Sequence, residues 1–127
     1  MITEDYVSFE TAKLLKEKGF DEPCECFYDT EHNDISIVNG WMDTSNSLLE
    51  KREFLCYSAP TLQMAMKWLR EIHGLWCEIS WEGKGLWCME VFSLMDEEFI
   101  PDSIVHEIKS YEEACEAAIK YCLENLI

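Results

Sequence analysis

The chain has 127 residues, of which 48% are hydrophobic and 13% aromatic. A chain of this size and composition can bury one core, so we expect a single domain over residues 1–127 and no extensive disorder. Acidic residues outnumber basic residues by 26 to 10, a formal net charge of −16, which argues against direct binding to nucleic acid or to an anionic membrane.

The N-terminal half is predicted to contain one helix and several short strands. The helix is expected from about Phe9 to Lys18, because Ser8 is a favourable N-cap residue and Gly19 a favourable stop. The segment between the second and third strands is polar and predicts a loop at 43–53. Strands are expected at 24–28, 35–41 and 54–57, the first two paired as a hairpin.

The C-terminal half opens with a second predicted helix, which starts around Pro60 and ends at Gly74. The clearest hairpin of the chain follows and joins residues 75–81 to 86–94. A two-residue turn at Gly83 and Lys84 would pair Trp81 with Leu86 and thereby fix which side chains share a face.

A short edge strand is expected from Ile104 to Ile108. The segment Ser110 to Glu113 is a capping box and predicts a last helix that reaches Leu126. Hairpins interspersed with helices are typical of an α+β protein, here a small antiparallel sheet with about three helices packed mainly on one face.

Both faces of the main hairpin are rich in apolar residues, although only one can cover the core. Either another segment, such as 43–53, covers the second face, or that face is an interface with a second copy or another protein. With the predicted register, the residues of this possible interface are Trp76, Trp87, Met89 and Val91.

Cysteine is the residue type that comes nearest to a metal motif. Cys24 and Cys26 form a C-x-C, and Cys56, Cys77 and Cys88 could lie near them in a sheet. The spacing of a zinc knuckle is absent, so small buried core thiols are the favoured interpretation. A metal or thiol site built from Cys24, Cys26 and their neighbours remains an alternative.

Other site motifs are incomplete. His106-Glu107 begins a zincin motif, but the position of the second histidine holds Ser110. Asp29, Glu31 and Asn33 have the spacing of a calcium loop, whose required glycine and terminal glutamate are missing. With no phosphate loop, nucleotide fingerprint or nucleophile elbow, we predict no catalytic residues, no cofactor and no enzymatic activity.

The chain has no run of 18 apolar residues and no apolar stretch near its N-terminus, so neither a membrane span nor a secretory signal is expected. Seven cysteines without an export signal are typical of reduced thiols. We therefore expect a cytoplasmic protein.

Two helical segments carry a resemblance. Tyr57–Glu71 has an A-P-T helix start and a K-W-L-R-E end, and Ser110–Glu124 contains Y-E-E-A. Together with the hairpin between them, they resemble small uncharacterised proteins of phages, prophages and mobile elements of gut Bacteroides-type bacteria. The resemblance implies a bacterial host cell and an accessory role, and it carries no site residues.

Three functions follow as hypotheses. The first is a non-enzymatic accessory protein of phage or mobile-element origin that acts through protein–protein contacts, with a protein partner or as a homo-oligomer. The second is an acidic mimic of nucleic acid that inhibits a host DNA-binding protein. It would need a row of carboxylates, whereas residues 1–57 and 58–127 each contain 13 acidic and 5 basic residues. The third is the cysteine-based metal or thiol site.

Overall fold

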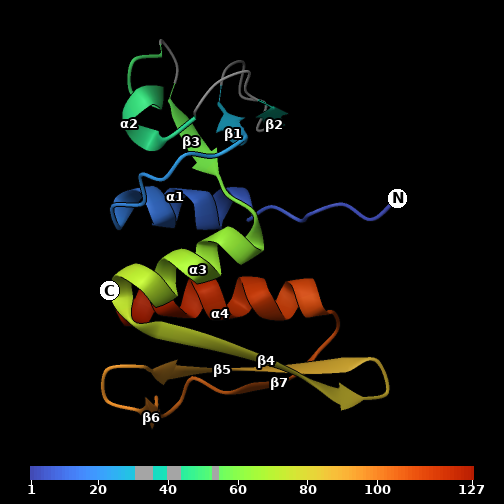
Figure 1. Cartoon of the computed structure of the whole chain (residues 1–127). Coiled ribbons are helices and arrows are strands. Elements are labelled where there is room, and N and C mark those ends of the chain that lie inside the picture. Colours follow the sequence, from blue (N-terminus) through green and yellow to red (C-terminus); the bar gives the residue numbers. More distant parts are fainter. Residues whose placement is uncertain (31–35, 40–43, 53–54) are drawn as a thin grey trace. The chain divides into compact units, whose positions relative to one another are not determined.

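The computed structural model describes residues 1–30, 36–39, 44–52 and 55–127. These residues form four α-helices and two antiparallel sheets, which confirms the α+β class (Figure 1). The chain divides into two compact units, Met1–Thr61 (unit 1) and Leu62–Ile127 (unit 2). The single domain expected over residues 1–127 stays a prediction, because compactness alone does not measure independent folding.

Unit 1 is built around a three-stranded sheet. Its strand order is β2-β1-β3, with both pairings antiparallel, so the predicted hairpin of the first two strands is confirmed. A buried cluster of Phe27, Leu49 and Cys56 belongs to its core. The elements are α1 (Phe9–Glu17), β1 (Cys26–Asp29), β2 (Ser36–Asn39), α2 (Asn46–Leu49) and β3 (Cys56–Ala59).

Helix α1 begins where the sequence predicts. The Ser8 side chain accepts a hydrogen bond from the Thr11 backbone N–H, and so satisfies one of the donors that a helix start leaves open. Gly19 follows the helix with φ +91°, a backbone conformation that glycine adopts without strain. The buried stripe of α1 contains Ala12 and Leu15.

The polar segment predicted as a loop contains the short helix α2, which corrects that prediction. Asn46, the first residue of α2, is buried, and its side chain forms hydrogen bonds with two backbone groups. Its Nδ2 donates to the Phe20 carbonyl at 2.7 Å, and its Oδ1 accepts from the Ser58 N–H at 3.0 Å. These two hydrogen bonds connect the start of α2 to Phe20 and to β3, and they satisfy the buried polar side chain of Asn46.

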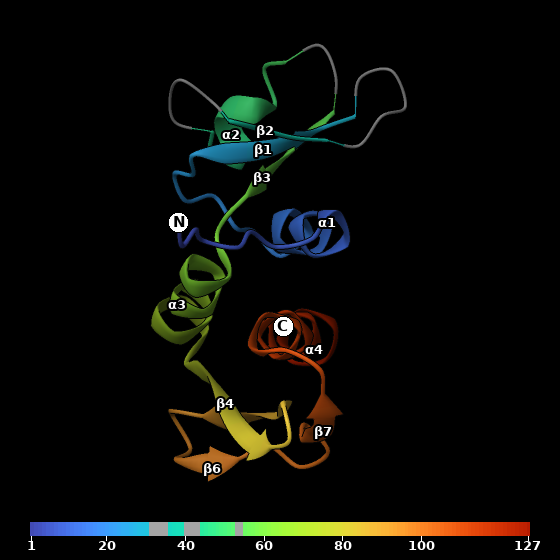
Figure 2. The ribbon, with the colours of Figure 1, turned by 90° about the vertical axis from the view of Figure 1, so that its right-hand side faces the viewer.

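Unit 2 is a four-stranded antiparallel sheet with two helices. β5 is central: it pairs with β4 on one side and with both β6 and β7 on the other. Helices α3 and α4 lie on the same side of the sheet (Figures 1 and 2). The elements are α3 (Leu62–His73), β4 (Leu75–Gly83), β5 (Leu86–Ser93), β6 (Glu98–Phe99), β7 (Val105–Ile108) and α4 (Tyr111–Asn125).

Helix α4 covers one face of this sheet. Ser110 caps it by accepting a hydrogen bond from the Glu113 N–H, as the capping box predicts. Its small residues Ala114 and Ala118 are buried against Met89 of β5. The same core is joined by partly buried side chains of the helix, the hairpin and β7: Cys77, Ile79, Trp87, Ile108, Ala117 and Tyr121.

The register of the β4–β5 hairpin differs from the prediction by one residue. Trp81 pairs with Trp87 rather than with Leu86, because the turn is centred on Lys84 and Gly85. Both turn residues have positive φ, +56° and +75°, which is the requirement of a type I′ hairpin turn. A one-residue shift exchanges the faces of one strand relative to its partner, so the predicted grouping of side chains is wrong.

No helix in the described part of the chain is both long and apolar enough to cross a bilayer.

Candidate functional site

The face of the four-stranded sheet that points away from α4 is here named the outer face. Side chains alternate along a strand, and Cys77, Ile79, Trp87 and Met89 pack toward α4. The neighbouring positions therefore belong to the outer face. They are Trp76, Glu78 and Ser80 on β4, and Cys88, Glu90 and Phe92 on β5.

Three aromatic side chains form a row across the outer face. Phe92 on the central strand pairs with Trp76 on β4 and with Phe99 on β6. The rings of Phe92 and Phe99 meet edge to face, with centroids 5.7 Å apart. Trp76 and Phe99 are each 38% exposed, so the row presents apolar rings to solvent. We call Trp76, Phe92 and Phe99 the aromatic row.

The predicted interface of Trp76, Trp87, Met89 and Val91 does not share one face. Met89 and Val91 are 2% and 0% exposed, and they belong to the helix-covered side of β5. Trp87 lies on that side too, where its ring meets Tyr111 edge to face at 5.4 Å. Only Trp76 is on the outer face. The cause of this correction is the one-residue register shift.

Carboxylates flank the aromatic row. Glu78 and Glu90 are direct cross-strand partners. Glu78 accepts a hydrogen bond from Trp76 Nε1 at 2.7 Å, which fixes the indole ring beside it. The guanidinium of Arg70 lies 5.7 Å from the centre of the Trp76 ring and supplies one positive charge at that end. The outer face is therefore aromatic in one part and acidic next to it.

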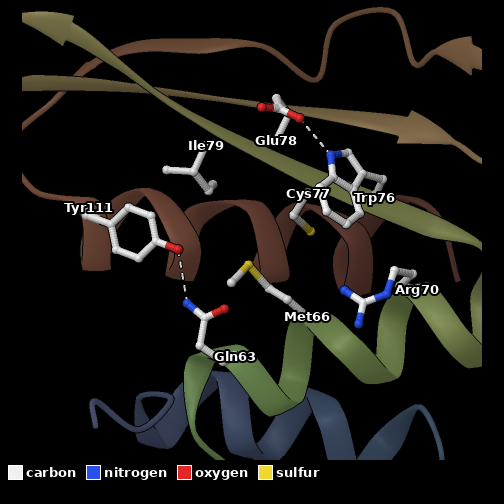
Figure 3. A pocket seen from close by; sticks show the side chains of 8 residues that line it. All are labelled: Gln63, Met66, Arg70, Trp76, Cys77, Glu78, Ile79 and Tyr111. Carbon is white, nitrogen blue, oxygen red and sulfur yellow. Dashed lines mark hydrogen bonds between the residues drawn. The ribbon is translucent and has the colours of Figure 1, made fainter. Parts of the chain in front are cut away.

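A pocket of about 170 Å³ opens beside β4 (Figure 3). Gln63 and Tyr111 close one end through a 3.0 Å hydrogen bond, and Arg70 stands near Trp76 at the other. The lining residues are Gln63, Met66, Arg70, Trp76, Cys77, Glu78, Ile79 and Tyr111. This lining contains no histidine, and Cys77 has a raised pKa because it is hydrogen-bonded to Cys122 and buried. The thiol of this pocket therefore has no histidine beside it in the lining.

At the end of the outer face that is nearer to the β4–β5 turn, three possible metal ligands lie close together. The ligand atoms of Glu82, Cys88 and His106 all lie within 4.8 Å of one another. His106 Nδ1 is 2.8 Å from one carboxylate oxygen of Glu82, and the other oxygen accepts the Glu107 N–H at 2.9 Å. We call Glu82, Cys88 and His106 the ligand cluster.

Two backbone irregularities bring the ligand cluster together. Trp81 pairs with Trp87 and Gly83 with Leu86, which leaves Glu82 as the extra residue of a bulge in β4. On the other side of β5, His106 and Glu107 together stand opposite Cys88, and Glu107 has φ +59°. Bulges on both neighbouring strands thus turn a carboxylate and an imidazole toward one buried thiol.

The charges in the ligand cluster have clear causes. The Glu107 N–H and the His106 imidazole hold the pKa of Glu82 below its ordinary value. Burial, and then the nearby Glu82 carboxylate, raise the pKa of the Cys88 thiol. A thiol with a raised pKa is a poor nucleophile at neutral pH.

The cysteines that the sequence singled out do not all belong to one unit. Cys24, Cys26 and Cys56 belong to unit 1, and Cys77 and Cys88 to unit 2. Cys26 and Cys56 are buried core residues, as expected for structural thiols. Cys77 Sγ lies 3.9 Å from Cys122 Sγ. Of these cysteines, only Cys88 joins a mixed ligand set in the described chain.

The structure shows the surroundings of only some residues of the two incomplete motifs. Glu31 and Asn33 of the rejected calcium loop lie outside the described residues. His106, whose zincin motif is incomplete, does become a cluster member, but through the fold rather than through the motif. No local spacing could reveal this, because Glu82, Cys88 and His106 come from three strands.

Comparison of the chain with protein-family models, with curated proteins and with solved structures gives no match.

Proposed function

We propose that this chain is a non-enzymatic accessory protein that acts through protein–protein contact, with the aromatic row as the centre of the contact. The observation that carries the proposal is the exposure of Trp76 and Phe99 at 38% each, in register with Phe92 on the strand between them. Exposed aromatic rings favour association, and Trp and Phe are enriched where proteins meet.

The negative charge beside the aromatic row favours one kind of partner over another. Glu78 and Glu90 stand side by side next to the row, and unit 2 as a whole carries 13 acidic and 5 basic residues. A second copy would bring the same carboxylates against them, and like charges repel across a contact. A different protein with basic residues around an apolar centre would complement this face. We therefore favour a basic protein partner over a homo-oligomer.

The non-enzymatic part of the proposal rests on two observations. The pocket beside β4 contains no histidine next to its thiol, and the raised pKa of the metal-free Cys88 thiol makes it a poor nucleophile. The phage or mobile-element origin, and with it a bacterial cytoplasm, rests on the resemblance of Tyr57–Glu71 and Ser110–Glu124 alone. Both stay proposals.

The nucleic-acid mimic is the weaker alternative. A mimic needs closely spaced carboxylates along one surface. On the outer face, the carboxylates of Glu78 and Glu90 have aromatic, hydroxyl and thiol neighbours instead.

The test uses the full chain, immobilised, to capture proteins from bacterial lysate. The variant Trp76→Ala with Phe99→Ala removes the exposed rings of the row. The matched control, Ile72→Ala with Ile104→Ala, removes two exposed apolar side chains of unit 2 outside the row. We expect a basic protein to bind the wild type and the control, to bind the row variant at least about tenfold more weakly, and to dissociate as salt rises.

Circular dichroism first establishes that each variant is folded. Equal capture by the row variant and the wild type would refute the proposed surface. Sedimentation of the purified chain tests whether a second copy binds this face instead. If the wild type forms a concentration-dependent dimer and the row variant does not, the partner is a second copy and not a basic protein.

A further inference from the structure

We infer that Glu82, Cys88 and His106 bind a divalent transition-metal ion of the zinc class. This site goes beyond the proposed protein contact, and it uses none of the residues of the aromatic row. Its three ligands supply a carboxylate oxygen, a thiolate sulfur and an imidazole nitrogen from β4, β5 and β7. Each is a donor type that Zn²⁺ accepts in proteins.

The distances suit one ion after a small closure. Around a tetrahedral ion bound at about 2.0–2.3 Å, neighbouring ligand atoms lie roughly 3.3–3.8 Å apart. The ligand atoms of the cluster lie within 4.8 Å of one another, so no pair needs to close by more than about 1.5 Å. Side-chain rotation can supply this movement, since the side chains of His106 and Glu82 are 58% and 30% exposed.

The fold positions two of the ligands in advance. The Glu107 N–H holds one oxygen of Glu82 at 2.9 Å, and this hydrogen bond can persist while the other oxygen binds the ion. Cys88 is 5% exposed on the central strand, so its sulfur has little freedom to move. Outer hydrogen bonds that orient ligands in this way are a regular feature of protein metal sites.

The donor set selects among metals. Calcium and magnesium prefer oxygen ligands only, so a site with a thiolate and an imidazole disfavours both. Zn²⁺ and Co²⁺ accept this mixed set in tetrahedral geometry. Three protein ligands leave a fourth position for water or for a group of a bound partner. Binding converts the Cys88 thiol to a thiolate, and its proton goes to solvent.

A simpler interpretation is a surface ion pair between His106 and Glu82 that happens to lie near a core thiol. The two interpretations differ in one respect: only the metal site requires all three side chains. Cobalt distinguishes them, because a thiolate bound to Co²⁺ produces a charge-transfer absorption band and tetrahedral Co²⁺ produces intense visible bands.

The experiment titrates chelator-treated full chain with CoCl₂ and then displaces the cobalt with ZnCl₂. The test variants are Cys88→Ser and His106→Gln. The matched controls are Cys24→Ser, which removes a thiol of unit 1, and Glu90→Gln, which removes a carboxylate of the same outer face. We expect the wild type and both controls to bind one cobalt with the thiolate band, which zinc abolishes.

Cys88→Ser should lose the thiolate band, and His106→Gln should bind cobalt at least about tenfold more weakly. A wild type without the band, a band that survives in Cys88→Ser, or an unchanged cobalt affinity in His106→Gln would overturn the site and leave the ion pair as the explanation. His106 is exposed, so His106→Gln keeps its fold and the test remains decisive even if Cys88→Ser unfolds. The row variant should still bind cobalt, so failure of the protein contact and failure of the metal site are separate outcomes.

Discussion

Glu78 and Glu90 stand directly opposite each other on β4 and β5. Two like charges at directly paired positions destabilise a sheet, by roughly 0.2–1 kcal/mol relative to a neutral pair. Glu90→Gln removes the repulsion and keeps the hydrogen bond from Trp76 Nε1 to Glu78. We therefore expect this variant to raise the free energy of unfolding by about that amount, as measured by urea denaturation at low ionic strength.

Glu98→Gln is the matched control, because the cross-strand partner of Glu98 is Ser93 rather than a carboxylate. It should change stability by less than about 0.5 kcal/mol. The gain from Glu90→Gln should shrink when salt is added, since salt screens exposed charges. A gain that is independent of salt would mean that repulsion is not its cause.

The hairpin turn gives a second prediction. Lys84 has φ +56°, a conformation that costs an ordinary L-residue about 1–2 kcal/mol and costs asparagine less. Lys84→Asn creates the Asn-Gly sequence preferred by type I′ turns, so it should stabilise the chain by about 0.5–1 kcal/mol in thermal unfolding.

Gly85→Ala tests the same turn in the opposite direction. Gly85 has φ +75°, and an added Cβ would meet no atom within 4 Å, so the cost is purely conformational. We expect a loss of about 1–2 kcal/mol. If both variants had the same sign of effect, the turn would not be centred on Lys84 and Gly85.

This turn also separates the features of the fold that the sequence could predict from those that it could not. Caps and stops are local, so Ser8, Ser110 and Gly19 placed the helix ends correctly. A hairpin register depends on a single residue, and Gly83-Lys84 and Lys84-Gly85 are both plausible turns by composition. The wrong choice moved Met89 and Val91 from the core to a supposed interface.

The ligand cluster could not be predicted for a related reason. Its members come from three strands, and two bulges aim Glu82 and His106 toward Cys88. Bulges leave no reliable pattern in one sequence, and a correct hairpin register would have brought only Glu82 and Cys88 near each other. An interface on the second face of the hairpin stays a prediction, and the aromatic residues of that face are Trp76 and Phe92, with Phe99 on the neighbouring strand β6.

Tyr6 provides a pH-dependent prediction in unit 1. Its hydrogen bond with Cys26, and then burial, raise the pKa of Tyr6 from 10.0 to about 12. A pKa raised by folding means that the neutral phenol stabilises the folded state fully below pH 10 and that this contribution disappears as the pH rises through 12.

Comparison with Tyr6→Phe isolates that contribution. The wild type should exceed the variant in unfolding free energy at neutral pH, and the difference should vanish as the solution approaches pH 12. Denaturation at a series of pH values measures it, and subtraction cancels the other tyrosines. A difference that is constant with pH would show that the phenol proton has no part in stability.

A substitution of Asn46 tests whether the two hydrogen bonds of its side chain hold α2 in place. Asn46→Ala removes the hydrogen bonds that Asn46 makes with the Phe20 carbonyl at 2.7 Å and with the Ser58 N–H at 3.0 Å. A buried backbone group that loses its hydrogen-bond partner, here the Ser58 N–H, costs about 1–3 kcal/mol, so we expect a loss of at least about 1–3 kcal/mol in urea denaturation. Asn125→Ala is the control, because Asn125 is exposed and its Nδ2 donates only to the Tyr121 carbonyl, at 3.1 Å. It should change stability by less than about 0.5 kcal/mol. Similar values for the two variants would mean that water replaces Asn46 and that apolar packing of Leu49 holds α2 instead.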